Sequence, residues 1–140
     1  MRADNSPRMR ALRMLLMADG TALFLLGALV LVFPKQTLAA FHFTNLPEGV
    51  NYLIGLWGCA LATFGIGYAV AATDATRHVI WVQIGIARGV LEAVFGGWCV
   101  ARALVTWEQA GFGIILAAFV AIAYLALYPG KENLWAGSRL

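Results

Sequence analysis

Arg88 and Glu92 lie one helical turn apart inside a stretch from Val79 to Val100 that is otherwise apolar. An ionisable side chain at the centre of a bilayer costs about 2.5–3.5 kcal/mol on insertion scales. Such side chains are retained where they pair, line a water-filled cavity or take part in chemistry. The pair therefore predicts a polar site within a membrane span.

The composition indicates a membrane protein. The chain has 140 residues, of which 61% are hydrophobic and 12% are charged, and its mean hydropathy is +0.78. A soluble domain carries about a quarter charged residues. The lipid bilayer is therefore the expected partner, and the length predicts a single domain covering residues 1–140. Nucleic-acid binding is excluded, because no basic stripe with interleaved aromatic residues occurs outside the apolar segments.

Four apolar segments match the thickness of a bilayer, since about 20 helical residues cross its hydrocarbon core. The predicted spans cover residues 12–33, 51–72, 79–102 and 107–128, with one sizeable outer loop at 34–50. Each boundary has a proline, glycine or charged residue that marks the exit of the chain. The first segment is too long for the apolar core of a signal peptide, so we expect it to be retained. The predicted fold is an all-α antiparallel four-helix membrane bundle.

The positions of lysine and arginine predict the orientation. With a cytoplasmic N-terminus, only Lys35 and Arg102 lie outside, and the remaining basic residues except Arg88 lie inside. We therefore expect both termini in the cytoplasm and a multi-pass location in the inner membrane of a bacterium. Tyr124 and Tyr128 are expected at the inner membrane–water interface, where tyrosine is favoured.

Helical projection of the third span places its polar residues on one stripe. The stripe that holds Arg88 and Glu92 also contains His78, Trp81 and Cys99. Small residues, which let membrane helices approach closely, occur along its border and in the second span. They are Gly85, Gly89, Ala93 and Gly97 in the third span, and Gly58 and Ala62 in the second. The stripe should therefore face the bundle interior or a partner helix.

Asp19 is the third ionisable residue within a span. At 1.5 Å per residue, Asp19 lies about 10 Å and Arg88 about 13 Å from the cytoplasmic edge. We predict that Arg88 bridges Asp19 and Glu92. If all three ionise, the cluster carries one net negative charge, so one carboxyl should take up a proton near neutral pH. The cluster either holds the helices in register or forms a ligand or proton site.

The remaining reactive residues give no motif for catalysis. Cys59 and Cys99 are expected as small packing residues, with a disulfide or redox pair as the alternative. His42 and His78 lie on opposite sides of the membrane, so one cofactor cannot use both, although either could supply one axial ligand. No CxxC, nucleotide loop, HExxH motif or serine-hydrolase turn occurs. We predict no catalytic residue, metal or cofactor.

The segment Thr73–His78, which leads into Trp81 and the run Gly85–Glu92, gives the chain a likeness to known proteins. Together with four short-looped spans in 140 residues, it resembles the small bacterial BphX-like and DoxX-like membrane proteins. BphX-like members accompany genes of aromatic degradation, and DoxX-like members include accessory subunits of quinone-linked oxidoreductases. The resemblance implies an accessory role in the membrane and transfers no catalytic residue.

Three functional hypotheses follow. The first is a non-enzymatic accessory or interaction subunit, or a binder of a hydrophobic ligand, built around Asp19, Arg88 and Glu92. The second is a small proton-coupled transporter that acts as a homodimer, with Glu92 or Asp19 as the titrating group. The third is a cofactor-binding redox accessory subunit that uses His78 or the cysteines. The first and third allow another membrane subunit as partner.

Overall fold

The computed structural model describes residues 6–44, 46–47 and 49–129. All regular secondary structure in these residues is helical. The helices are α1 (Pro7–Val32), α2 (Pro34–Ala40), α3 (Val50–Thr73), α4 (Val79–Ala101) and α5 (Trp107–Leu127). Apart from α2, each is long and apolar enough to cross a membrane. An all-α, multi-pass membrane protein is therefore supported.

The helix ends follow from local capping. The Ser6 side chain accepts a hydrogen bond from the Met9 N–H, so α1 begins before the apolar segment that predicts a span from residue 12. Pro34 follows the end of α1 and opens α2 within the predicted outer loop, because proline suits a first helical turn but not a helix interior. Thr106 and Gln109 form a reciprocal capping box at the start of α5.

The turn from α3 to α4 is organised by Asp74. Its carboxylate accepts hydrogen bonds from the backbone N–H of Arg77 at 3.1 Å and from the Thr76 hydroxyl at 2.8 Å. These two bonds, the Arg77 N–H first, hold the pKa of Asp74 below its ordinary value. The carboxylate thus stays charged at neutral pH and closes the turn that leads into α4.

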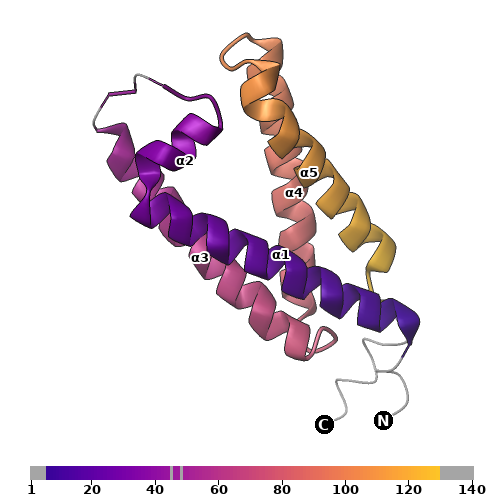
Figure 1. Ribbon diagram of the computed structural model, residues 1–140. Coiled ribbons are helices and arrows are strands. Elements are labelled where there is room, and N and C mark those ends of the chain that lie inside the picture. The colour runs from indigo at the N-terminus through magenta and orange to yellow at the C-terminus, as the bar shows by residue number, and fades with distance from the viewer. Residues whose placement is uncertain (1–5, 45, 48, 130–140) are drawn as a thin grey trace.

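The long helices form two pairs, α1 with α3 and α4 with α5 (Figure 1). In the first pair the backbones touch, because a methyl group on Gly27 would lie 2.7 Å from the Ala62 nitrogen. Similarly, a methyl group on Gly65 would lie 2.6 Å from the Gly20 oxygen. The residue numbers rise along α1 as they fall along α3, so the two helices of this pair run in opposite directions.

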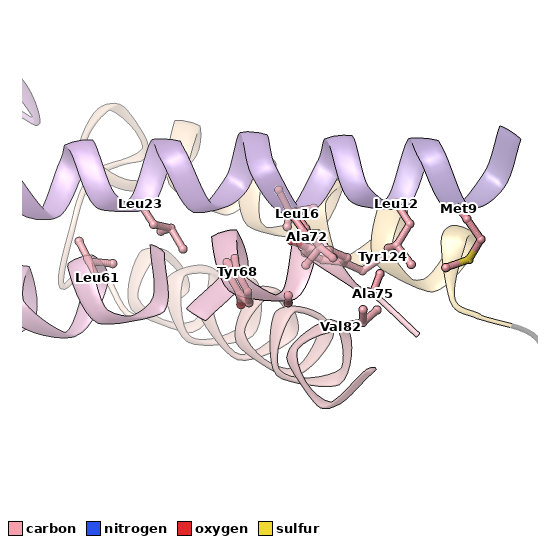
Figure 2. Close-up of a cluster of buried hydrophobic side chains, with 12 residues drawn as sticks. Met9, Leu12, Leu16, Leu23, Leu61, Tyr68, Ala72, Ala75, Val82 and Tyr124 are labelled. Carbon is pink, nitrogen blue, oxygen red and sulfur yellow. The ribbon is translucent and has the colours of Figure 1, made fainter. Parts of the chain in front are cut away.

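The two pairs meet at the end that holds the start of α1 and the end of α5. Arg8 donates hydrogen bonds to the carbonyls of Ala126 at 2.9 Å and Tyr128 at 2.8 Å, which lack partners within α5. A buried core occupies this end, which we call the closed half (Figure 2). Its side chains include Met9, Leu12, Leu16, Tyr68, Ala72, Ala75, Val82 and Tyr124.

Toward the opposite end the pairs diverge, and we call this the open half (Figure 1). Here the Gln109 side-chain amide donates to the His42 carbonyl at 3.0 Å, which joins the start of α5 to the segment after α2. Large apolar side chains on the outer faces are exposed, for example Leu91 at 68% and Phe119 at 64%. A lipid environment accounts for this exposure, because acyl chains solvate such side chains as well as a protein core does.

Candidate functional site

Asp19 of α1 and Arg88 of α4 form an ion pair between the two helix pairs. Arg88 Nη2 lies 2.9 Å from both Asp19 oxygens, and the side chains are only 8% and 12% exposed. The Tyr124 hydroxyl of α5 donates a third hydrogen bond to Asp19 Oδ2 at 3.0 Å. Carboxylate oxygens without hydrogen-bond donors are strongly unfavourable in a membrane. Here the oxygens of Asp19 are paired with donors from two other helices.

Glu92 is held far more loosely. Its Oε1 lies 4.0 Å from Arg88 Nε, and its side chain is 49% exposed. The structure thus brings all three predicted residues together, but unequally. Asp19 and Arg88 neutralise each other through short hydrogen bonds, and Glu92 is left as the additional ionisable group.

Two tyrosines complete the site, and sequence reasoning missed both. Tyr124, predicted at the membrane interface, is fully buried, because Asp19 provides an internal acceptor for its hydroxyl. Tyr68 places its ring 5.4 Å below the Arg88 guanidinium, a cation–π distance. The buried Tyr68 hydroxyl has no hydrogen-bond partner among the described residues. A tyrosine within an apolar span was the available signal, since its hydroxyl needs a partner in lipid.

A cavity of about 370 Å³ extends from this cluster into the open half. Asp19 and Arg88 line its end nearest the buried core, and Glu92 lies one turn farther along α4. All four long helices and Phe41 contribute apolar walls. The wall residues include Leu26, Phe41, Trp57, Leu61, Phe95, Phe112, Gly113 and Val120. The arrangement combines an apolar compartment with one partly exposed carboxyl group.

The residues predicted to flank the site have different positions. Trp81 packs edge-on against Tyr68, with ring centroids 5.7 Å apart, and so supports the tyrosine beneath Arg88. His78 occupies the N-cap position of α4 without a side-chain capping hydrogen bond, and neither it nor Cys99 lines the cavity. Cys59 is exposed, Cys99 is partly buried, and both are free thiols. No group of three His, Cys, Asp or Glu in the described ranges could hold a metal ion.

The small residues of α4 pack on α5 only in part. Methyl groups on Gly85 and Gly89 would each lie 2.6 Å from α5 atoms, namely Tyr124 Cε2 and the Ala117 oxygen. Gly97, the last residue of the predicted small-residue ladder, has nothing within 4 Å in the described part of the chain, so within the bundle it does not continue this contact, and its packing on a partner helix stays a prediction. A four-residue step turns a helix by about 40°, and three steps move Gly97 about 120° away from Gly85. Gly96 takes its place against Ile114.

The small residues of the second span contact α1. A methyl group on Gly58 would lie 3.0 Å from Val30 Cγ1, and Ala62 lies against Gly27. The partner glycines in α1, Gly20 and Gly27, were not identified from the sequence. Their seven-residue spacing is the signal that could have found them, because it returns to nearly the same helix face.

The likeness of the chain to BphX-like and DoxX-like proteins stays a proposal. Comparison with family models, curated proteins and solved structures gave no match for this chain.

Proposed function

We propose that this protein is a non-enzymatic multi-pass membrane protein that binds a hydrophobic molecule between its two helix pairs. The observation that carries the proposal is the apolar cavity that ends on a charged cluster. Its volume, about 370 Å³, falls within the range of roughly 300–1,000 Å³ typical of small-molecule sites. Apolar walls with a few polar groups at one end are also the usual composition of such sites.

In the membrane, we propose an antiparallel four-helix arrangement with both termini in the cytoplasm of a bacterium. Arg8, Arg10 and Arg13 cluster at the start of α1, whereas Lys35 and Arg102 belong to the opposite end. The excess of basic residues on the first side supports this orientation. The cavity would then open toward the outer half of the bilayer, where a membrane-dissolved molecule can enter between the helix pairs.

The cluster would have two separate roles under this proposal. Asp19 and Arg88 are nearly buried and link the two helix pairs, so they define the end of the cavity. Glu92 contributes little to that link, since its nearest basic atom is 4.0 Å away. A half-exposed carboxyl at a cavity wall is available to a ligand instead.

Two of the wider hypotheses remain compatible with this site. The resemblance to BphX-like and DoxX-like proteins implies an accessory role beside another membrane subunit. Such a role requires only that the other subunit receive the ligand or respond to its binding. The half-exposed Glu92 carboxyl also favours the alternative of a proton-coupled transporter acting as a homodimer. The charged groups that face this carboxyl are Arg88 on α4 and Asp19 on α1. Tyr68 of α3 contacts Arg88, and Tyr124 of α5 contacts Asp19.

The proposal is tested by filling the cavity. Gly113 lines the cavity, and a Cβ added there has nothing within 4 Å, so we expect the side chain of Gly113→Leu to extend into the cavity. The matched control is Gly97→Leu, which adds the same side chain to α4 at a position outside the cavity with nothing within 4 Å. Both changes remove a helical glycine, so both affect helix propensity alike.

Binding is measured in lipid nanodiscs with the neutral fluorophore N-phenyl-1-naphthylamine, corrected for its partition into protein-free discs. We expect saturable binding to the wild type and to Gly97→Leu, and a loss of about tenfold or more in affinity for Gly113→Leu, because overlap with a ligand of several carbons removes well over 1.4 kcal/mol. Equal binding to all three proteins, or no saturable binding to any, would overturn the proposal.

A further inference from the structure

The charges that line the cavity differ in their accessibility. Glu92 is 49% exposed, whereas Arg88 and Asp19 are 12% and 8% exposed. Arg88 directs Nη2 to Asp19, and its Nε and Nη1 are buried from contact with a ligand, without hydrogen-bond partners in the described part of the chain. A molecule in the cavity therefore meets a carboxyl group rather than a guanidinium.

The charge balance points the same way. Asp19 and Arg88 sum to zero, so an ionised Glu92 leaves the cluster with one net negative charge. An unbalanced charge at this depth is unstable unless it is protonated or paired with a cation. A ligand that brings one positive charge restores neutrality, whereas an anion would double the imbalance.

The cavity walls also suit a cation. Phe41, Trp57, Phe95 and Phe112 line the cavity, and aromatic faces attract a cation by about 0.5–2 kcal/mol each, most strongly when water is excluded. Phe95 lies three residues after Glu92, on the same face of α4. The ligand's remaining surface must be apolar, because aliphatic and aromatic carbon forms the rest of the compartment.

We propose that the cavity binds a monovalent lipophilic organic cation, with its charge against the Glu92 carboxylate and its apolar groups against the aromatic walls. This inference rests on the proposed function and adds the chemical class of the ligand. It predicts that the cavity binds a cation more tightly than an anion of the same size, a preference that the binding of a neutral fluorophore does not require.

The test compares two ions of nearly the same size and shape, tetraphenylphosphonium and tetraphenylborate. Each displaces N-phenyl-1-naphthylamine from the protein in nanodiscs, with each ion's concentration corrected for its partition into protein-free discs. We expect the cation to displace the fluorophore at a concentration about tenfold or more below that of the anion, since a charge-assisted contact is worth at least about 1.5 kcal/mol.

Glu92→Gln should weaken tetraphenylphosphonium binding by about tenfold and remove its advantage over tetraphenylborate. The matched control is Glu108→Gln, which removes the same charge from the exposed first turn of α5, outside the cavity. A second variant, Phe95→Leu, removes an aromatic face without changing charge. It should weaken tetraphenylphosphonium binding by about threefold, because a cation–π attraction is lost, and should have a smaller effect on tetraphenylborate binding.

The two failures are distinguishable. Fluorophore binding with equal displacement by both ions, or with unchanged cation affinity in Glu92→Gln, overturns the cation assignment and leaves the proposed function intact. Absence of cavity-dependent fluorophore binding in the wild type overturns the proposed function and the cation assignment together. Should Glu92→Gln not fold, an unchanged cation affinity in Phe95→Leu would still overturn the assignment.

Discussion

The closed and open halves of the molecule are built from the same four long helices, yet one contains a core and the other a cavity. In the closed half, Tyr124 and Tyr68 fill the space between the helix pairs and are fully buried. In the open half, Gly113 and the half-exposed Trp57 line a space that no side chain fills. Apolar composition alone therefore does not decide between core and cavity. The distance between the helix pairs decides it.

The polar cluster lies at the boundary between the halves. Asp19 follows the core residue Leu16 by less than one turn, and Leu23 and Leu26 on the next turns of α1 line the cavity. Its ion pair with Arg88 and its hydrogen bond from Tyr124 join the two pairs at the point where the cavity begins. Three predictions test the difference between the two halves and the role of this boundary.

Removing Arg88 should have the largest effect. Arg88→Met leaves Asp19, whose side chain is 8% exposed, as a buried charge without its cation. We expect the free energy of unfolding to fall by about 3–5 kcal/mol, the usual loss when one partner of a buried ion pair is removed. The free energy of unfolding is measured by steric trapping during reversible unfolding in mixed micelles.

The double variant Asp19→Asn with Arg88→Met is the control. It removes both charges and keeps an acceptor for Tyr124, so most of the lost stability should return. If the single variant lost less than about 1 kcal/mol, the pair would behave as a solvated surface contact and the boundary would not depend on it.

The second prediction contrasts a glycine of the closed half with one of the open half. Gly85→Ala brings a methyl group 2.6 Å from the ring of Tyr124, which is buried and cannot move aside. We expect a loss of about 2 kcal/mol, because overpacking a tight core costs about 1–3 kcal/mol.

Gly97→Ala is the matched substitution on the same helix, where the methyl group meets nothing within 4 Å. There, we expect no loss, and a gain of up to about 1 kcal/mol from helix propensity. Equal thermal unfolding temperatures for the two variants, measured by circular dichroism, would contradict the distinction between the halves.

The smallest effect is expected at the two buried tyrosines. Tyr124→Phe removes one hydrogen bond to Asp19 and should lower the free energy of unfolding by about 1 kcal/mol, in line with hydrogen bonds between membrane helices. Tyr68→Phe keeps the ring beneath Arg88 and removes a hydroxyl without a hydrogen-bond partner among the described residues. It should be neutral or slightly stabilising, since burying such a hydroxyl is unfavourable. A larger loss for Tyr68→Phe would refute this assignment of hydrogen bonds.

Much of the candidate site could be predicted because ionisable residues are rare in apolar segments. Asp19, Arg88 and Glu92 were identified by residue type and depth, and the structure places Asp19 and Arg88 in direct contact. The sequence could not predict that Asp19 is bound closely and Glu92 loosely, because this difference depends on the Tyr124 hydroxyl of α5, 105 residues from Asp19. That Gly96 rather than Gly97 packs on α5 could not be predicted either, since it depends on helix rotation and divergence.

By itself, the sequence determined the helical class, the four long apolar segments and the residues that form the polar cluster. These follow from local hydropathy, capping and the high energy of charge in lipid. The tertiary structure alone decided that the four long helices form two diverging pairs, that Asp19 rather than Glu92 binds Arg88 closely, and that a cavity opens beside Glu92. Those features depend on the distances between helices, which arise from side chains far apart in the chain.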